Sequence, residues 1–195
     1  MIIAPLRLGI AGLGTVGVGV LKMINKNASL ISLRTGRDVI VTAVSARSRS
    51  KDRGINLSGF AWENDPIALA MREDVDVFVE LMGGSDGPAK DATEAAIAAG
   101  KDVVTANKAM LAVHGQSLAL AAESAGQVIR FEAAVAGGIP VVKALTEGLA
   151  GNKINRVLGV MNGSCNYILT RMETSGLSYE DIFAEANALG YLEAD

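Results

Sequence analysis

A glycine-rich string between an apolar run and a helical run is the first part of the chain whose residue types and spacing could do chemistry. It consists of Gly12, Leu13, Gly14, Thr15, Val16 and Gly17. In a G-x-G-x-x-G string the first glycine permits a tight turn, the second lets backbone approach a pyrophosphate, and the third lets the helix lie close to the strand. The N-terminus of the following helix adds free N–H groups and a partial positive charge. The string therefore predicts a dinucleotide-binding turn, with an ordinary glycine-rich turn as the alternative.

The second β-rich run ends in basic residues, where an NAD-specific site would have an acidic one. In such a site an Asp or Glu accepts hydrogen bonds from the adenine ribose. Here Arg47 stands at that place, and Arg49, Lys51 and Arg53 follow. Guanidinium groups can hold a 2′-phosphate bidentately, so the sequence favours NADP, with NAD still possible. Arg47 is the residue that we expect at the phosphate, whereas a solvated basic loop explains the other three about as well.

Two strings that follow apolar runs place polar groups where ligands of open α/β sheets collect, at the carboxyl ends of parallel strands. They are Glu80–Gly84 and Thr105–Lys108. From the second string, Lys108 could reach a nicotinamide ring or a substrate. A lysine just after a strand is by default a solvated residue, so position alone leaves both interpretations open.

A carboxylate and a flexible turn stand together at Glu132–Pro140. In an extended segment, alternate carbonyls could point to one side and, with the Glu132 carboxylate, form an oxygen cage for a hard cation. The carbonyls concerned belong to Val135, Gly137 and Ile139. A turn that crosses between two domains explains the same residues without any cation, and spacing alone favours that explanation.

The single histidine and the single cysteine, His114 and Cys165, are far apart in the sequence. A nucleophilic Cys–His pair would need the fold to bring them together, and packing or loop roles are the simpler explanation. A single cysteine also excludes an internal disulfide and a multi-cysteine metal site.

Short β-rich runs alternate with Ala-rich helical runs in the first two thirds of the chain. Repeated strand, crossover and strand imply parallel pairing with right-handed connections, and nearly continuous apolar strands imply a sheet that is covered on both faces. The expected fold class is α/β, with a doubly wound parallel Rossmann sheet. Strands are expected at Leu6–Ile10, Val39–Ser45, Val75–Leu81, Val103–Thr105 and Val128–Glu132, and helices at Val16–Asn25, Thr93–Ala99 and Gln116–Ser124.

The character of the sequence changes after Glu132, where glycines and a proline cluster. We therefore expect an NAD(P)-binding Rossmann domain over residues 1–132 and part of a second domain, the start of an α+β domain, over residues 133–195. The elements expected in this second part are a helical segment at Val141–Leu149, a strand at Ile154–Met161, and helices at Asn166–Glu173 and Tyr179–Leu189.

Composition limits the broad class of the protein. Half of the 195 residues are hydrophobic and 20% are charged, with a formal net charge of −3. Acidic and basic residues are scattered, so we expect no basic face for a phosphate backbone and no nucleic-acid partner. Arg7 interrupts the apolar N-terminal stretch, and no signal-peptide pattern or membrane-length apolar run follows. The expectation is a cytoplasmic protein without a membrane partner.

Five groups of residues, in their order and spacing, resemble the homoserine dehydrogenase family. The resemblance spans the whole chain, and the later strings are far more specific than the first. The strings are Gly12–Gly17, Val104–Ala109 with His114–Gly115 after it, Phe131–Pro140, Gly159–Leu169 and Gly190–Asp195.

The resemblance implies an oxidoreductase that interconverts L-homoserine and L-aspartate 4-semialdehyde with NAD(P)(H), in threonine and methionine biosynthesis. It implies a small-molecule substrate and, for the full-length enzyme, a homodimer whose second domain binds substrate and dimerises. By the same resemblance, Gly12–Gly17 and Arg47 would hold the adenosine and phosphates. Gly83 and Lys108 would lie along the cofactor, with Lys108 as the catalytic candidate, and Gly190 would touch the cofactor from the second domain.

The resemblance also assigns the substrate and the cation. Glu193 would bind the amino group of the substrate, and the oxygen cage at Glu132 would hold a sodium ion. Two residues depart from the family pattern: Ser164 stands where Thr is usual, and Leu192 stands where a small residue is usual. In the family, two substrate-binding aspartates and the lysine thought to donate the proton lie in a segment that would follow Asp195.

Two other functions stay open at this stage. A different dehydrogenase on the same Rossmann scaffold would have to share the later strings by coincidence. The 195 residues could also act as a non-catalytic NADP-binding or oligomerisation module.

Overall fold

The computed structural model describes residues 3–160 and 162–192. They divide into two compact units, within residues 1–148 and 149–195. The second unit contains α7 (Gly163–Ser175) and α8 (Tyr179–Ala188). The first unit contains β1 (Leu6–Ala11), α1 (Thr15–Lys26), α2 (Ala28–Thr35), β2 (Val39–Ser45), β3 (Ala61–Glu63), α3 (Pro66–Met71), β4 (Val77–Glu80), α4 (Pro88–Ala98), β5 (Asp102–Thr105), α5 (Lys108–Ala125), β6 (Ile129–Arg130), the 3₁₀ turn η1 (Glu132–Ala134), α6 (Val141–Lys143) and the π-helical turn η2 (Ala144–Gly148).

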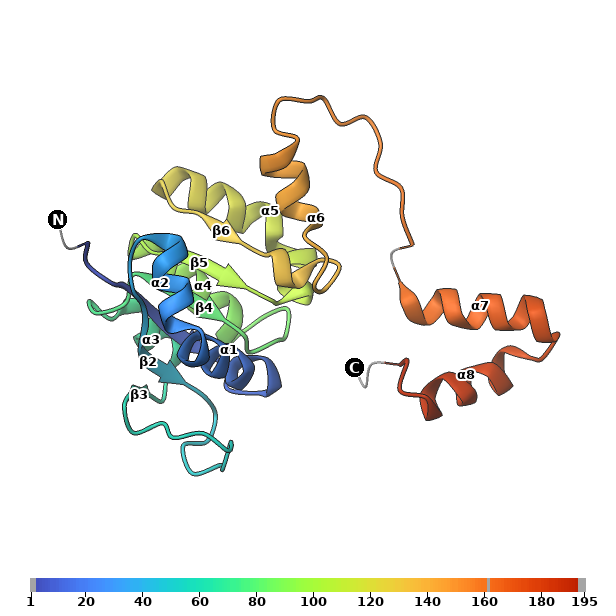
Figure 1. Cartoon of the computed structure of the whole chain (residues 1–195), viewed down its shortest axis with the longest axis horizontal. Helices are drawn as coiled ribbons and strands as arrows, with labels where there is room; N and C mark the ends of the chain where they lie inside the picture. Colours follow the sequence, from blue (N-terminus) through green and yellow to red (C-terminus); the bar gives the residue numbers. More distant parts are fainter. Residues whose placement is uncertain (1–2, 161, 193–195) are drawn as a thin grey trace. The chain divides into compact units, whose positions relative to one another are not determined.

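The strands of the first unit form one parallel sheet in the order β3-β2-β1-β4-β5-β6 (Figure 1). The chain builds outward from β1 to β3, and then returns to place β4 on the other side of β1. Such a reversal leaves a crevice at the carboxyl ends of the two strands where it occurs, which is where open α/β sheets bind ligands. The doubly wound parallel sheet expected from the sequence is confirmed.

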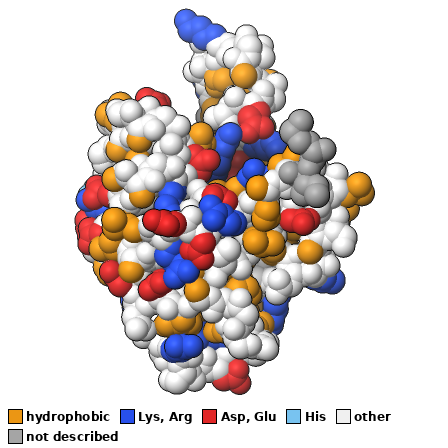
Figure 2. Space-filling view, turned by 90° about the vertical axis from the view of Figure 1, so that its left-hand side faces the viewer, with side chains coloured by type: hydrophobic (Ala, Val, Ile, Leu, Met, Phe, Trp, Pro, Cys, Tyr) orange, Lys and Arg blue, Asp and Glu red, His pale blue; other side chains and the backbone are white. Residues whose placement is uncertain are grey.

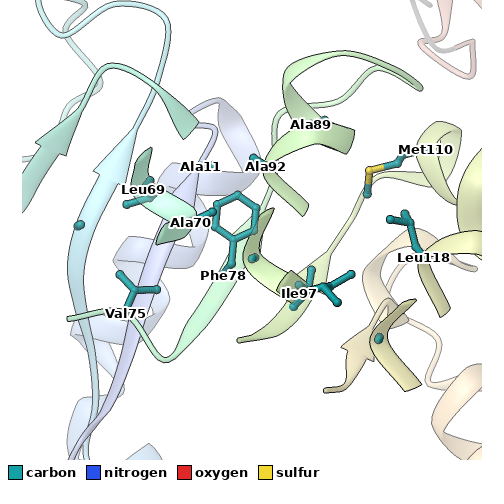
Figure 3. Close-up of a cluster of buried hydrophobic side chains, with 14 residues drawn as sticks. Ala11, Leu69, Ala70, Val75, Phe78, Ala89, Ala92, Ile97, Met110 and Leu118 are labelled. Atoms are coloured by element: carbon teal, nitrogen blue, oxygen red, sulfur yellow. The ribbon is translucent and has the colours of Figure 1, made fainter. Parts of the chain in front are cut away.

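Successive side chains of β4 serve two separate cores, because strand side chains alternate between the faces of a sheet. Val77 and Val79 belong to the core beneath α1, whereas Phe78 is fully buried in the core beneath α3 and α4. Figure 3 shows the Phe78 ring between Ala70 of α3 and Ala92 of α4. Full burial of a side chain of this size contributes roughly 1.5–3 kcal/mol. The two cores fix β4, and with it the loop that follows.

Local capping sets the ends of the helices around this sheet. The Asp65 carboxylate accepts the Ile67 N–H at the start of α3, and the Asn107 side-chain oxygen accepts the Met110 N–H at the start of α5. Such caps satisfy backbone donors that the helix itself leaves free. At the other end of α5, Gly126 has a φ of 70°, a left-handed conformation that glycine adopts without strain.

Charged side chains on the surface are paired rather than grouped by sign. On the face drawn in Figure 2, Lys and Arg side chains are interspersed with Asp and Glu side chains. The Arg7 guanidinium lies 2.6 Å from the Asp76 carboxylate, and the Arg72 guanidinium lies between Glu63 and Asp74.

Among the helices that the structure describes, none combines the length and the apolar character that crossing a bilayer requires.

The second unit is a helical hairpin within its described residues. Ile182 of α8 is fully buried and Ile168 of α7 is 6% exposed, and they share a small core. The Arg171 guanidinium and the Tyr167 hydroxyl both donate to the Glu185 carboxylate across the two helices. The Arg171 hydrogen bond is the larger cause that holds the pKa of Glu185 below its usual value.

The strand expected at Ile154–Met161 is wrong over its described part, residues 154–160, which carries no regular secondary structure. Its apolar side chains are exposed, with Leu158 at 82% and Val160 at 74%. A strand is stable only when a neighbouring strand accepts its backbone hydrogen bonds, and the described residues provide no such neighbour for this run.

Residues 133–148 pack with the first unit, although the sequence places a domain boundary near residue 132. Both Glu132 carboxylate oxygens accept backbone N–H groups from α6, at 3.1 Å from Val142 and 2.8 Å from Lys143. These bonds tie the connecting turn to the end of the sheet. The functional boundary at residue 132 stays a prediction, because compactness alone does not define a functional domain.

Candidate functional site

A pocket of about 510 Å³ lies at the carboxyl edge of the sheet, around the ends of β1, β2 and β4. Five of the expected cofactor residues line it: Gly12, Leu13, Gly14, Arg47 and Gly83. The remaining lining residues are Ser45, Ala46, Ser48, Lys51, Arg53, Asn64, Pro66, Leu81, Met82, Pro88 and Ala89. The switch point of the sheet and the predicted cofactor residues therefore coincide.

The glycine turn of this pocket depends on two close backbone approaches. Gly12 has a φ of +98°, and a Cβ atom there would lie 2.3 Å from the carbonyl oxygen of Leu81. A Cβ atom at Gly17 would lie 1.9 Å from the carbonyl oxygen of Gly12. Only glycine fits either position, because any side chain would collide with backbone. The first and third glycines thus serve the turn and the approach of α1, as the spacing indicates.

The second glycine faces open space instead of protein. Gly14 has extended backbone, with φ −80° and ψ −162°, and a Cβ atom on it would meet nothing within 4 Å. Gly14 is also the N-cap of α1 and provides no side-chain cap, and the first turn carries no acidic residue. The N-terminus of α1 can therefore offer backbone N–H groups and positive potential to an anion.

Thr15 and Val16, the other two residues of the glycine string, begin α1 without lining this pocket. Val16 is 56% exposed and lines an apolar groove of about 590 Å³ between α1 and the sheet. A cofactor contact from these two residues would come from their backbone N–H groups.

Arg53 holds the basic loop after β2 in place. Its guanidinium donates to three carbonyl oxygens, those of Leu13 at 3.1 Å, Ser48 at 2.7 Å and Lys51 at 2.8 Å. Arg53 therefore joins the glycine turn to the loop that carries Arg47. The sequence left a phosphate ligand and a solvated residue as alternatives for Arg53, and the structure adds a bracing contact to both.

Arg47 is exposed and lines the pocket, as does Lys51. Arg49 lies outside the lining, with its guanidinium carbon 6.0 Å from the centre of the Trp62 ring, and that of Arg53 lies 5.8 Å from it. These distances are those of a cation–π contact. Of the basic side chains that line the pocket, Arg47 and Lys51 are thus the ones that no described contact with Trp62 or with the glycine turn engages.

A buried polar network joins the ends of β4 and β5. Glu80 and Thr105 are fully buried and Asn107 is 5% exposed. The Thr105 hydroxyl donates to Glu80 Oε2 at 2.6 Å, and the second oxygen, Oε1, accepts the N–H groups of Met82 at 2.7 Å and Gly83 at 3.3 Å. The network therefore reaches the loop that lines the pocket.

The sequence places Glu80 and Thr105–Asn107 at strand ends but does not indicate a binding or structural role for them. The signal that could have found the network is the charge of Glu80 at the end of an otherwise apolar strand, because a buried carboxylate requires hydrogen-bond donors. Asn107 could also have been identified as a helix N-cap from its residue type.

Lys108 is the first residue of α5, and its side chain is exposed near the end of β5.

Further along α5, His114 Nε2 lies 2.8 Å from Oδ1 of Asp86, a residue of the loop after Gly83 and Gly84. Hydrogen bonds from Ser85 and, as the smaller cause, from His114 lower the pKa of Asp86. Cys165 lies in the other unit and is exposed, whereas the described contact of His114 joins α5 to the loop after β4.

The four residues of the predicted oxygen cage lie in the segment from η1 to the residue before α6. Besides the two hydrogen bonds that the Glu132 carboxylate accepts, the carbonyl of Ile139 accepts the Val141 N–H at 2.8 Å. Ala136 has a φ of 53°, the one non-glycine residue with positive φ among those described. Of the two expected residues in the second unit, Gly190 follows α8, and Glu193 lies outside the described residues.

Comparison with known proteins identifies the family. Residues 12–132 match the family model described as the homoserine dehydrogenase NAD-binding domain, and residues 140–195 match the model described as homoserine dehydrogenase. The chain belongs to the homoserine dehydrogenase family.

Individual homoserine dehydrogenases align with nearly the whole chain. Those of Neisseria gonorrhoeae and Pseudomonas aeruginosa are 48% and 44% identical over 191 residues, which is 98% of this chain and 43% of each relative. The crystal structure of a homoserine dehydrogenase from Thiobacillus denitrificans superposes with a TM-score of 0.87 at 42% identity, over 98% of this chain and 44% of that one. The chain thus spans less than half the length of these relatives.

A further solved relative carries a cofactor. A hyperthermophilic archaeal homoserine dehydrogenase in complex with NADPH has a TM-score of 0.81 at 25% identity, over 98% of this chain and 63% of that one. Homoserine dehydrogenases are oxidoreductases that act on a small molecule, and the NAD-binding domain of the family covers the pocket described above.

Proposed function

We propose that the chain binds a nicotinamide dinucleotide across the carboxyl edge of its sheet and prefers NADP to NAD. The observation that carries the proposal is the pocket in which the glycine turn, Arg47 and Gly83 come together. The turn and the uncapped N-terminus of α1 suit a pyrophosphate, and the exposed Arg47 suits a 2′-phosphate. The NADPH complex of the archaeal relative supports the same choice.

In the whole enzyme this cofactor would serve the interconversion of L-homoserine and L-aspartate 4-semialdehyde, in threonine and methionine biosynthesis in the cytoplasm. The bound nicotinamide supplies the hydride chemistry. Lys108, at the start of α5 and close to the end of β5, would place a positive charge near the aldehyde oxygen of the substrate, on which negative charge develops during hydride transfer. Gly190 would touch the cofactor and Glu193 would bind the amino group of the substrate, within a homodimer.

We also propose that the turn at Glu132 binds a sodium ion. The donor set is one carboxylate with the carbonyls of Val135, Gly137 and Ile139, and hard cations prefer such oxygens. Each Glu132 oxygen accepts one backbone N–H, which leaves lone-pair capacity for a cation. The residues present are therefore chemically suited to this ion.

The test of cofactor choice is a fluorescence titration of the chain with NADPH and with NADH. A charge-assisted bidentate contact contributes about 1.5–3 kcal/mol, so NADPH should bind about ten- to a hundredfold more tightly. Arg47→Glu should remove or reverse that preference. Arg34→Glu is the matched control, because Arg34 is exposed on α2 outside the pocket and its reversal changes the net charge equally.

Equal dissociation constants for the two cofactors in the unmutated chain would contradict the NADP preference. Loss of the preference in Arg34→Glu as well as in Arg47→Glu would mean that net charge, and not a phosphate contact, determines it. Binding of neither cofactor would contradict the proposed function itself.

A further inference from the structure

We propose that Glu80, Thr105 and Asn107 act as positioning residues that set the shape of the Met82–Gly84 loop for the nicotinamide half of the cofactor. The proposal rests on the proposed function, because it assumes that a dinucleotide occupies the pocket. None of the three side chains is assigned a ligand contact. Their role is to hold the backbone that makes one.

The order of the strands indicates which half of the cofactor this loop meets. Along the carboxyl edge, the loop with Arg47 follows β2, the glycine turn follows β1, Met82–Gly84 follows β4 and Lys108 follows β5. With the pyrophosphate at the glycine turn and the adenine ribose at the end of β2, the other half of the dinucleotide extends over the ends of β4 and β5. That half carries the nicotinamide ring.

The network fixes the loop at both of its ends. Glu80 Oε1 accepts the Met82 and Gly83 N–H groups at the first end, and the Asn107 side-chain amide donates to the Gly84 carbonyl oxygen at 2.8 Å at the other. Gly83 and Gly84 have φ values of 82° and 90°. Glycines in this region are conformationally free, so the contacts at the two ends select one conformation from many.

Thr105 connects the two halves of the network. Its hydroxyl donates to Glu80 Oε2 at 2.6 Å and accepts the backbone N–H of Asn107 at 2.9 Å. A hydroxyl has one donor and can also accept, so Thr105 satisfies a carboxylate on β4 and a backbone donor after β5 at once. Through this residue the loop after β4 is set by the position of α5, which begins at Lys108.

The use of a carboxylate at Glu80 argues against a purely packing role. A fully buried charge is costly unless it is hydrogen-bonded, and an apolar side chain would end β4 at lower cost. The described hydrogen bonds that the Glu80 carboxylate accepts come from the loop and from Thr105. On the pocket side, a Cβ atom at Gly83 would meet nothing within 4 Å, which leaves the loop backbone accessible to a ligand.

The experiment compares two probes on the chain and its variants. NADPH spans the whole pocket, whereas 2′,5′-ADP has the adenosine and both of its phosphates but no nicotinamide. Thr105→Val keeps the shape and removes the hydroxyl, and it should weaken NADPH binding at least about tenfold while 2′,5′-ADP changes less than about twofold. Thr105→Ser, which keeps the hydroxyl, should restore NADPH affinity to within about threefold of the unmutated chain.

Two further variants separate positioning from stability. Val103→Ala removes another fully buried side chain of β5, so it should lower the melting temperature and leave both affinities unchanged. Asn107→Ser retains an oxygen that can cap α5 but loses the amide that holds Gly84, so it should repeat the selective loss of NADPH binding. It serves as the decisive variant if Thr105→Val does not fold.

Unchanged NADPH binding in the folded Thr105→Val or Asn107→Ser variant overturns the positioning role alone. Equal loss of both probes in folded Thr105→Val and Asn107→Ser also overturns it, because the effect is then not confined to the loop after β4. If the unmutated chain binds neither probe, the proposed function fails and the positioning role fails with it.

Discussion

Gly12→Ala is expected to damage both the stability of the first unit and its cofactor binding. The added Cβ atom would lie 2.3 Å from the Leu81 carbonyl oxygen, and reaching 3.0 Å requires a backbone shift of about 0.7 Å. A left-handed alanine costs about 1–2 kcal/mol and overpacking costs about 1–3 kcal/mol, so we expect a loss of about 2–5 kcal/mol. The shift separates the glycine turn from the loop after β4, and these form two of the sides of the pocket.

The assay for this variant combines urea denaturation and thermal denaturation with an NADPH titration. At about 2–4 °C per kcal/mol for a unit of this size, the melting temperature should fall by about 4–20 °C. Gly14→Ala is the matched control, because its Cβ atom meets nothing within 4 Å and its backbone is extended. Its unfolding free energy should change by less than about 0.5 kcal/mol, while NADPH binding weakens at least about tenfold because the methyl group enters the space for the phosphates.

Two results would refute this reasoning, one for each glycine. If Gly12→Ala melts like the unmutated chain, the approach of Gly12 to Leu81 is not a constraint of the fold. If Gly14→Ala binds NADPH normally, the pyrophosphate does not lie against the glycine turn, and the dinucleotide assignment of the pocket loses its main support.

Three further outcomes are expected. The hydrogen bonds from Arg7 lower the pKa of Asp76, so the Asp76 carboxylate stabilises the fold fully above its unfolded pKa of about 3.9 and loses this effect as the pH falls through its lower folded pKa. Urea curves of Asp76→Asn and of the unmutated chain should differ at neutral pH and converge below about pH 4. Convergence toward high pH would contradict this cause of the stabilisation. Glu132→Ala removes the hydrogen-bond acceptor at the start of α6 and should lower the unfolding free energy by about 0.5–2 kcal/mol, whereas Glu147→Ala, whose carboxylate lies in exposed ion pairs, should lower it by about 0.5 kcal/mol or less. Replacing choline chloride by sodium chloride should raise the melting temperature of the unmutated chain but not that of Glu132→Ala. An equal rise in both would contradict the sodium site. A polypeptide of residues 1–195 should bind NADPH but oxidise homoserine far more slowly than a full-length relative, because the family resemblance places the proton donor outside these residues and positioned acid catalysis contributes about 10²–10⁴-fold. Comparable kcat values would show that the catalytic groups lie within residues 1–195, and the absence of any turnover would favour a cofactor-binding module.

The sheet and the glycine turn could be predicted because their signals are local. The glycine spacing, the apolar runs and the switch from strand to helix each depend on a few neighbouring residues, and the family resemblance joined them. Short elements escaped prediction: β3 has three residues and α3 has six. Segments of that length carry too little periodicity to stand out and are held mainly by packing on the rest of the sheet.

Errors arose where structure depends on distant partners. One error was local: the helix expected from Gln116 begins eight residues earlier, at Lys108, because the Asn107 cap determines its start. The run from Ile154 has the apolar residues of a strand but no strand beside it in the described residues. The charge of Glu80 marks a buried polar site, but its partner Thr105 and the Leu13 carbonyl that Arg53 reaches lie 25 and 40 residues away, so these contacts could not be predicted.

The single tryptophan, Trp62, gives the chain a built-in optical probe of its basic loop. Its indole N–H donates to Asn64, a pocket-lining residue, at 2.9 Å, and its ring lies next to the guanidinium groups of Arg49 and Arg53. Indole emission responds to nearby charge, so a phosphate bound at Arg47 of the same loop changes its wavelength and intensity without any label. Occupancy of the adenosine end can therefore be read from the protein itself with 2′,5′-ADP, which has no nicotinamide ring to absorb the indole emission.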